Sequence, residues 1–164
     1  LFDFVRNAIS RRNNWTVPAR RHSWQSTVYP SRQVNNVGTL VIARDTSGSV
    51  DNEMLAKFNA YGNQAIQAIG GRTLCIDCDA RICGETWVEV GDELPNKANG
   101  GGGTDFRPVF SRVQELTEAG EDFAGLVYIT DLAGTFPDEP PPFPCLWLSI
   151  NSSIAPFGRT IEIS

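Results

Sequence analysis

Oxygen-bearing side chains at alternate positions follow the first strongly apolar run of this 164-residue sequence. The run at 39–43 leads into Arg-Asp-Thr-Ser-Gly-Ser-Val, which places Asp45, Ser47 and Ser49 two residues apart. Carboxylate and hydroxyl oxygens are hard donors, which suit Mg²⁺ or Mn²⁺ better than Zn²⁺. The spacing therefore indicates a candidate cation-binding loop directly after a strand.

Two more oxygen donors stand at comparable places further along the chain. Thr104 follows a glycine-rich stretch, and Asp131 ends the apolar run at 123–130. Two aspartates at neighbouring strand ends would repel each other without a cation between them. We therefore expect one divalent cation, Mg²⁺ with Mn²⁺ and Ca²⁺ as alternatives, among five donors: Asp45, Ser47, Ser49, Thr104 and Asp131.

Each of these donors also has a simpler structural interpretation. The donors of the first loop could cap the helix that follows them, and Thr104 is a good N-cap for a later helix. Asp131 could be a solvated strand end. Asp79 and Asp105 lie close enough in the sequence to support the site indirectly, although solvation at the surface is the simpler expectation for both.

The periodicity of the sequence predicts alternating strands and helices. Helical spacing predicts an amphipathic helix over 51–69, another after Thr104 and a short one within 1–10. Apolar runs predict strands over 39–43, 72–79, 82–90, 123–130 and 145–150, with an edge strand in 157–163. This order predicts an α/β fold with an open, mostly parallel, Rossmann-like sheet, one antiparallel hairpin strand, and helices on both faces.

The ends of the predicted strands carry the first functional signal. Ligands of open α/β sheets bind beyond the carboxyl ends of the strands, where the strand order reverses. Asp45 and Asp131 both lie at such an end. The predicted fold would therefore bring their two loops to one edge of the sheet.

Charge is distributed unevenly along the chain. Residues 1–32 carry six arginines and one acid, whereas residues 33–164 carry eight basic and 18 acidic side chains. An acidic body favours cations and disfavours nucleic acid. We expect an irregular N-terminal arm rich in arginine and aromatic residues over 1–36, and one α/β domain over 37–164.

No membrane or export signal stands out in the sequence. No stretch approaches the roughly 20 apolar residues of a membrane span, and no basic-then-apolar leader marks secretion. We therefore expect a cytoplasmic protein. Since the chain begins with Leu, we also expect it to be a piece of something longer.

The four cysteines, Cys75, Cys78, Cys83 and Cys145, include one C-x2-C pair. That pair falls in a predicted strand, where residues three apart point to opposite faces. This placement favours small buried side chains over a zinc or redox site.

The oxygen donors resemble a known metal site. The segment 45–49, Asp-Thr-Ser-Gly-Ser, followed at a distance by Thr104 and Asp131, is similar to the metal-ion-dependent adhesion site (MIDAS) of von Willebrand factor A (VWA) domains. The resemblance implies a VWA fold and a Mg²⁺ ion held directly by the hydroxyls, with the aspartates bound directly or through water. It also implies an open position for a carboxylate of a protein partner.

A narrower resemblance extends over nearly the whole sequence. The segments WTVPARR, YPSR, DTSGSV, GGGGTDFRPVF, YITD, PCLW and APFGR resemble the C-terminal VWA-like domain of a bacterial and phage family described as metallopeptidases. There the peptidase assignment belongs to an upstream domain with a His-Glu-x-x-His helix. This chain has a single histidine, His22, and no such motif, so the peptidase label does not carry over.

The match to that family is imperfect after Asp131. Leu-Ala-Gly at 132–134 stands where the family usually has Gly. By analogy with bacterial VWA proteins, the resemblance implies a MoxR-type AAA+ ATPase or an upstream peptidase-like domain as partner.

These observations predict a metal-dependent protein-interaction module that binds an acidic ligand of a partner protein, rather than an enzyme. The alternative is a hydrolase, because bound Mg²⁺ could activate water, or the accessory domain of a metallopeptidase-like protein whose catalytic domain is absent here. A structural module with an empty site is a third class. An aspartic peptidase, a serine hydrolase and a P-loop are disfavoured, because DTSGS lacks the D-T-G and G-x-S-x-G patterns and no Lys-Ser/Thr follows the glycines at 100–103.

Overall fold

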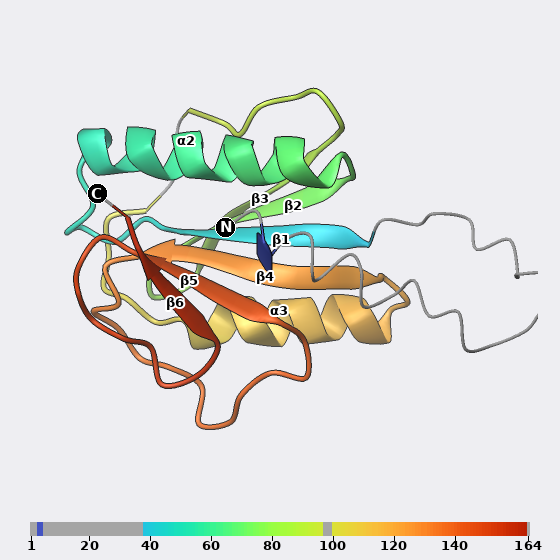
Figure 1. Cartoon of the computed structure of the whole chain (residues 1–164). Helices are drawn as coiled ribbons and strands as arrows, with labels where there is room; N and C mark the ends of the chain where they lie inside the picture. Colours follow the sequence, from blue (N-terminus) through green and yellow to red (C-terminus); the bar gives the residue numbers. More distant parts are fainter. Residues whose placement is uncertain (1–2, 5–37, 97–99, 164) are drawn as a thin grey trace, which may run out of the picture.

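The computed structural model describes residues 3–4, 38–96 and 100–163. It contains a six-stranded sheet in the order β3-β2-β1-β4-β5-β6 (Figure 1). The strands are β1 (Thr39–Asp45), β2 (Thr73–Cys78), β3 (Ile82–Val88), β4 (Phe123–Thr130), β5 (Cys145–Ser149) and β6 (Arg159–Glu162). Only the β2–β3 pair is antiparallel, which confirms the predicted mostly parallel sheet with one hairpin strand.

The predicted N-terminal arm at 1–36 lies outside the described residues apart from Asp3 and Phe4, which are helical. Phe4 is half-buried and packs against the core on the α2 side of the sheet. The arginines and His22 of the arm also fall outside the described part.

Helix α2 (Asn52–Ile69) covers one face of the sheet, and helix α3 (Arg107–Glu118) covers the other (Figure 1). The α2 helix begins after Asp51, whose carboxylate accepts a 2.8 Å hydrogen bond from the Met54 N–H. It ends at Gly70, which has a left-handed φ of 60°. The cap of this helix is therefore Asp51 and none of the three donors before it, which leaves those side chains available for another role.

The predicted N-cap of α3 was wrong. The helix begins at Arg107, and its N-cap residue Phe106 makes no side-chain cap hydrogen bond, although the Asp105 carboxylate accepts the Arg107 N–H at 3.0 Å. The preceding residues cannot join the helix because they pair with the loop after β4: the Phe106 N–H donates to the Thr135 carbonyl at 2.9 Å. Thr104 therefore lies in an extended segment before the helix, and its hydroxyl does not act as a cap.

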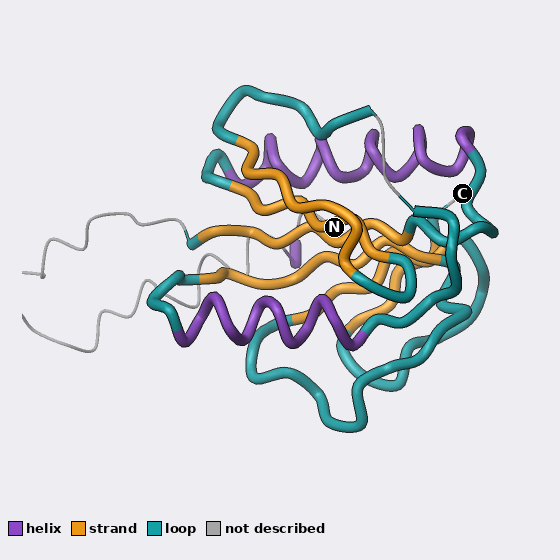
Figure 2. The backbone as a smooth tube through the Cα atoms, turned by 180° about the vertical axis from the view of Figure 1, so that it is seen from behind, coloured by secondary structure: helices purple, strands orange, loops and turns teal. Residues whose placement is uncertain are grey.

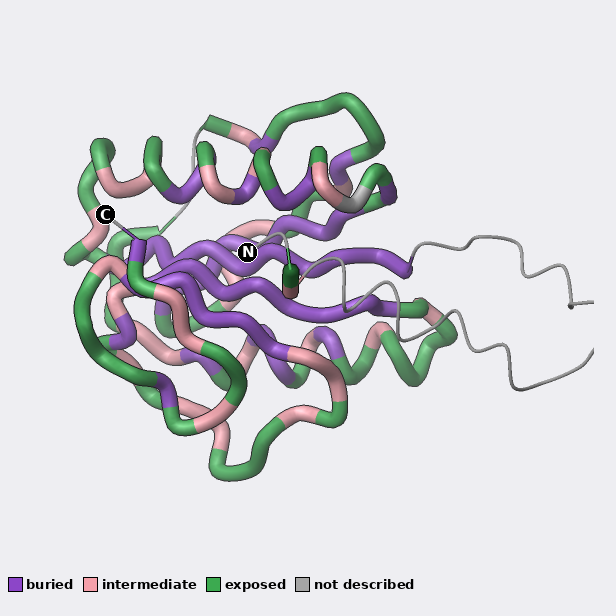
Figure 3. The backbone as a smooth tube through the Cα atoms, in the orientation of Figure 1, coloured by how far each residue is buried: buried purple, intermediate pink, exposed green. Residues whose placement is uncertain are grey.

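Two apolar layers hold the helices to the sheet, because side chains alternate between faces along each strand. On the α3 side, Phe106 and Phe110 pack against Tyr128 and Trp147. On the α2 side, the core contains Leu40, Ile42, Phe58, Ile66 and Leu148. The central strands are buried along their length, whereas each helix buries only one side (Figure 3).

The cysteine pair follows the predicted alternation. Cys75 belongs to the α2-side core and Cys78 to the α3-side core, and the four cysteines are free. Burial raises the pKa of the Cys75 thiol and of the Cys78 thiol to about 12. Both thiols are therefore protonated at neutral pH, which agrees with a packing role.

The loops that follow the carboxyl ends of the parallel strands gather at one end of the domain, on the left in Figure 1 and on the right in Figure 2. The strand order reverses between β1 and β4, because β1 pairs with β2 on one side and with β4 on the other. Beyond this switch point lie the loops that start at Asp45 and Asp131.

Neither α2 nor α3, the two long helices of the described part, has the length and apolar character needed to cross a membrane.

Candidate metal site

Asp45 forms the buried base of the candidate site. It is the last residue of β1 and is fully buried. Its Oδ1 accepts a 2.9 Å hydrogen bond from the Ser47 N–H, and its Oδ2 accepts a 2.6 Å hydrogen bond from the Thr130 hydroxyl. These two bonds fix the carboxylate in orientation and turn the chain so that Ser47 follows it into the loop.

The two serines and Asp131 form a continuous chain of oxygen atoms that runs from the interior to the surface. The Ser47 Oγ lies 3.1 Å from the Ser49 Oγ, and the Ser49 hydroxyl donates to Asp131 Oδ2 at 3.0 Å. Ser47 is buried, Ser49 is exposed and Asp131 is half-buried. The structure thus brings together donors that are 82 positions apart in the sequence, and it leaves their outer side open to solvent.

The loop that carries Thr104 contacts the serine loop through a backbone hydrogen bond. The Gly48 N–H, between the two serines, donates to the Gly102 carbonyl at 3.1 Å. On the other side of Thr104, the loop after Asp131 packs closely: a Cβ on Gly134 would lie 2.6 Å from the Thr104 methyl group. Among the described residues, no hydrogen bond joins the Thr104 hydroxyl to the other four side chains.

The charge balance of the site is unfavourable. Burial raises the pKa of Asp45, the hydrogen bonds from Thr130 and Ser47 oppose that rise, and the negative charge of Asp131 adds to it. Within the described part, the ion pairs of Arg and Lys side chains go to other acids and not to Asp45 or Asp131. A cation bound between the two carboxylates would relieve this repulsion.

The structure adds two residues to the site that the sequence interpretation missed. The buried Thr130 hydroxyl bonds Asp45 and also accepts a 3.0 Å hydrogen bond from the Leu132 N–H. The Asn151 side chain donates to the Asp131 carbonyl at 2.8 Å. Strand alternation could have indicated Thr130, since Leu126 and Tyr128 share its face, whereas nothing in the sequence pointed to Asn151.

Leu132 has an unusual backbone conformation beside Asp131. Its φ is 62°, in the left-handed region that favours glycine, although its side chain is buried in the α3-side core. A non-glycine residue in this region is strained by about 1 kcal/mol or more. This conformation gives a physical reason for the glycine expected at this position from the family resemblance.

The two acids considered as indirect supports have different surroundings. Asp105 pairs with Arg107 at 2.7 Å near the surface. Asp79 is buried, contrary to the expectation of solvation, and its Oδ2 accepts a 3.1 Å hydrogen bond from the Gly102 N–H. Asp79 is thus part of the loop structure that carries Thr104.

No group of three or more His, Cys, Asp or Glu side chains in the described part of the chain is arranged to hold a metal ion. A cation at the switch point would therefore depend on the serine and threonine hydroxyls in addition to the two carboxylates. That donor set is typical of a hard ion and differs from a zinc site built on thiolates or imidazoles.

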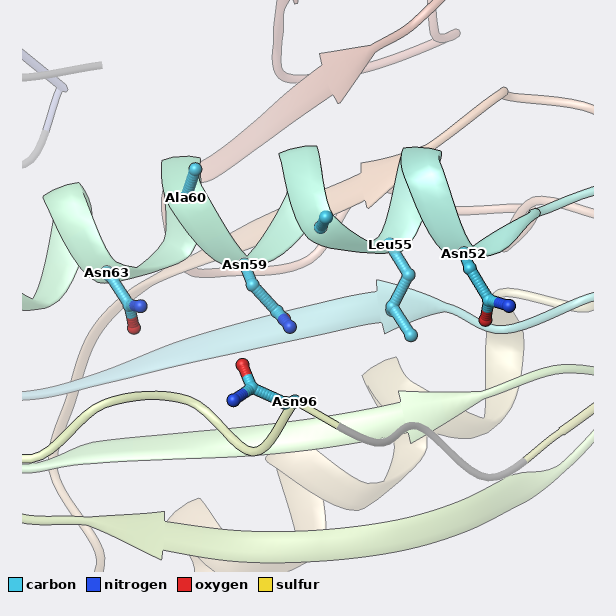
Figure 4. Close-up of a pocket in the computed structure, with 7 residues that line it drawn as sticks. Asn52, Leu55, Asn59, Ala60, Asn63 and Asn96 are labelled. Atoms are coloured by element: carbon cyan, nitrogen blue, oxygen red, sulfur yellow. The ribbon is translucent and has the colours of Figure 1, made fainter.

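A groove of about 550 Å³ lies along α2, and none of the five candidate donors lines it (Figure 4). Its polar lining is made of asparagine side chains, and Asn96 faces Asn59 and Asn63 across it. Asn59 Oδ1 accepts from the buried Arg44 guanidinium, and Asn63 Oδ1 accepts from the Leu94 N–H at 2.8 Å. Asn59 Nδ2 also donates to the Pro95 carbonyl at 3.4 Å, so Asn59 and Asn63 tie α2 to β1 and to the segment that follows β3 and have a structural role.

A six-stranded, mostly parallel sheet with a helix on each face and polar loops at its switch point defines a VWA-like α/β domain. The chain matches the family VWA-like domain (DUF2201) over residues 40–164, which is most of its length, and it belongs to that family. Comparison with curated proteins gave no match, and comparison with solved structures gave none either.

Proposed function

We propose that this VWA-like domain binds a divalent cation, with Mg²⁺ as the first candidate, and uses the ion to recognise an acidic side chain of a partner protein. Ser47, Ser49 and Thr104 would hold the ion through their hydroxyls, and Asp45 and Asp131 would hold it directly or through water. The observation that carries the proposal is the chain of oxygens from Ser47 through Ser49 to Asp131 at the switch point.

The chemistry and exposure of the donors support this function. All are oxygens, and two are carboxylates lacking an ion-pair partner among the described residues. Burial raises the pKa of Asp45, and the negative charge of Asp131 adds to that rise. Mg²⁺ keeps part of its water shell and needs few protein ligands. Since Ser49 is exposed, a carboxylate from outside could replace one of those waters.

The partner is proposed by its chemistry. Membership of the VWA-like family supports a role as an interaction or accessory module. An aspartate or glutamate of another protein would complete the coordination of the ion. A MoxR-type AAA+ ATPase or a peptidase-like domain of the same protein are the two partners that the family resemblance favours.

Thermal unfolding with and without Mg²⁺ tests the metal. At a Mg²⁺ concentration ten times its Kd, binding to the folded state adds about 1.4 kcal/mol, which raises the Tm by roughly 3–5 °C for a domain of this size. We expect Ser49→Ala to lose most of this rise in Tm, because the substitution removes a proposed ligand of the ion. Since Ser49 is exposed, the substitution does not disturb the core. Ser152→Ala is the matched control, since the Ser152 hydroxyl bonds Glu162 instead.

An NMR titration tests the acidic ligand. We expect an aspartate-containing peptide to perturb the amides of the 47–49 loop only when Mg²⁺ is present, and the asparagine version of the same peptide to have no effect. Equal Tm values with Mg²⁺ and with EDTA would refute the metal site. Turnover of a peptide or phosphoester that disappears with Ser47→Ala would replace binding by hydrolysis as the function.

A further inference from the structure

Thr104 is the proposed ligand whose position most needs an explanation. It follows a run of four glycines, Gly100 to Gly103, in which no side chain can restrict the backbone. Its own hydroxyl makes no hydrogen bond to the other proposed ligands among the described residues. Its distance from the serine hydroxyls therefore depends on the contact of its own carbonyl, which accepts the Thr135 N–H at 3.4 Å, and on backbone contacts of the residues on either side.

Asp79 supplies those contacts on both sides of Thr104. It follows the carboxyl end of β2, next to β1 in the sheet. Its Oδ2 accepts the Gly102 N–H at 3.1 Å, and its backbone carbonyl accepts the Asp105 N–H at 3.0 Å. Thr104 lies between the two donors, so one residue fixes the chain before it and after it.

The same contact continues into the serine loop. The Gly102 peptide donates its N–H to Asp79 and accepts, through its carbonyl, the Gly48 N–H at 3.1 Å. Gly48 stands between Ser47 and Ser49. Asp79, Gly102 and Gly48 thus form one hydrogen-bonded path that joins the Thr104 loop to the two serines.

Both oxygens of the Asp79 carboxylate accept hydrogen bonds from the backbone of these loops. Its Oδ1 accepts the Arg81 N–H at 3.0 Å, while Oδ2 accepts from Gly102. The hydrogen bond from Arg81 holds the pKa of Asp79 below its ordinary value, with the Gly102 N–H contributing in the same direction. Asp79 is therefore ionised at neutral pH, and a charged acceptor makes a stronger hydrogen bond than a neutral one.

We propose that Asp79 is a positioning residue of the metal site, which binds the loop at 102–105 and so sets the Thr104 hydroxyl against those of Ser47 and Ser49. This inference rests on the proposed function for its effect on the cation. The placement of the loop by Asp79 does not depend on the cation and can be tested without it.

Two matched pairs of variants separate this role from a general loss of stability. Asp79→Asn removes the charge that holds Gly102, whereas Asp105→Asn makes the same change on the loop at a carboxylate that pairs with Arg107. Gly102→Ala would place a Cβ 2.9 Å from Asp79 Oδ2 and push the loop away. Gly103→Ala is its control, because a Cβ there meets nothing within 4 Å.

The experiment measures amide hydrogen exchange by NMR without metal, and the Kd for Mn²⁺ by electron paramagnetic resonance of the free ion, well below the Tm of each variant. For Asp79→Asn we expect exchange at Gly102 and Gly48 to accelerate about tenfold, while amides in β1 and β4 keep their wild-type rates. We expect the Kd for Mn²⁺ to rise about tenfold in Asp79→Asn and Gly102→Ala, and to stay within twofold in both controls.

The outcomes separate this inference from the proposed function. If Asp79→Asn leaves exchange at Gly102 and Gly48 at the wild-type rate, Asp79 does not hold the loop and the inference is wrong. If the wild type binds Mn²⁺ and Asp79→Asn binds it equally well, the positioning of Thr104 is refuted. If the wild type binds no Mn²⁺ while exchange accelerates in Asp79→Asn, the proposed function fails and the placement of the loop by Asp79 stands. Should Asp79→Asn not fold, Gly102→Ala against Gly103→Ala decides the question.

Discussion

Replacement of Thr130 by valine tests how the buried carboxylate of the site is held. The two side chains have nearly the same shape, so Thr130→Val removes a hydroxyl from a fully buried position and opens no cavity. The hydroxyl donates to Asp45 Oδ2 at 2.6 Å and accepts the Leu132 N–H at 3.0 Å. The variant therefore removes one of the two hydrogen bonds to the buried Asp45 carboxylate and leaves the Leu132 N–H without its partner.

The size of the effect follows from these two bonds. A hydrogen bond to a charged group contributes about 1.5–3 kcal/mol, and a buried backbone donor left unpaired costs about 1–3 kcal/mol. Since the two losses share one hydroxyl and the loop can adjust, we expect Thr130→Val to lower the free energy of unfolding by about 2–4 kcal/mol at neutral pH. Domains are stable by about 5–15 kcal/mol, so the variant should still fold and can be measured by urea unfolding.

The pH dependence of this loss carries a definite sign. Burial raises the pKa of Asp45 above 3.8, so the folded state binds more protons than the unfolded state between 3.8 and the raised value. The stability contributed by Asp45 is then complete below 3.8 and is lost as the pH rises through its folded pKa. Without the Thr130 hydroxyl that pKa rises further, so the difference between wild type and variant should shrink as the pH falls towards 3.8.

Thr73→Val is the matched control for this prediction. Thr73 is also a fully buried strand threonine, but its hydroxyl finds no hydrogen-bond partner among the described residues. Its replacement by valine removes an unsatisfied buried group, so we expect a gain of about 1 kcal/mol. The reasoning is refuted if Thr130→Val changes stability by less than 0.5 kcal/mol, roughly the effect of an ordinary surface substitution, or if its loss grows at low pH.

Two further predictions concern the backbone and the α2 face. Leu132→Gly should be about 1 kcal/mol more stable than Leu132→Ala by urea unfolding, because only glycine accepts a φ of 62° without strain, and the reverse order would show that the conformation is not strained. Arg44→Met should lower the free energy of unfolding, measured with urea, by about 3–5 kcal/mol, because it removes the guanidinium that lies 2.7 Å from the buried Asp77 carboxylate. A loss below about 1 kcal/mol would mean that the ion pair contributes little to stability.

Much of the architecture was accessible from the sequence because it depends on local patterns. The apolar runs of β1 and β4 and the helical spacing of α2 predicted the order of these elements. They also predicted the ends of these elements to within two residues. Strand alternation also predicted that Cys75 and Cys78 face opposite layers, as the structure confirms. The donors at the ends of β1 and β4 could be placed at one edge because parallel strands share a carboxyl end.

The parts that could not be predicted depend on contacts between distant segments. Thr104 fits the local pattern of a helix cap, yet pairing of the next two residues with Thr135 delays the helix to Arg107. Asp79 looks like a solvated turn residue, and only the fold shows that its carboxylate reaches Gly102, which is 23 positions away. A propensity rule contains no information about such partners.

The burial of Asp45 connects the stability of the domain with its proposed function. An ionised carboxylate at a fully buried strand end lowers stability unless its charge is compensated, and an apolar residue would suit the α3-side core better. Thr130 and Ser47 satisfy the two oxygens with hydrogen bonds, but neither supplies a positive charge, and Asp131 adds a second negative one. This edge of the fold therefore lacks a positive charge among its described side chains. Under the proposed function a divalent cation would supply that charge, and the exposed position of Ser49 would leave the ion accessible to a partner.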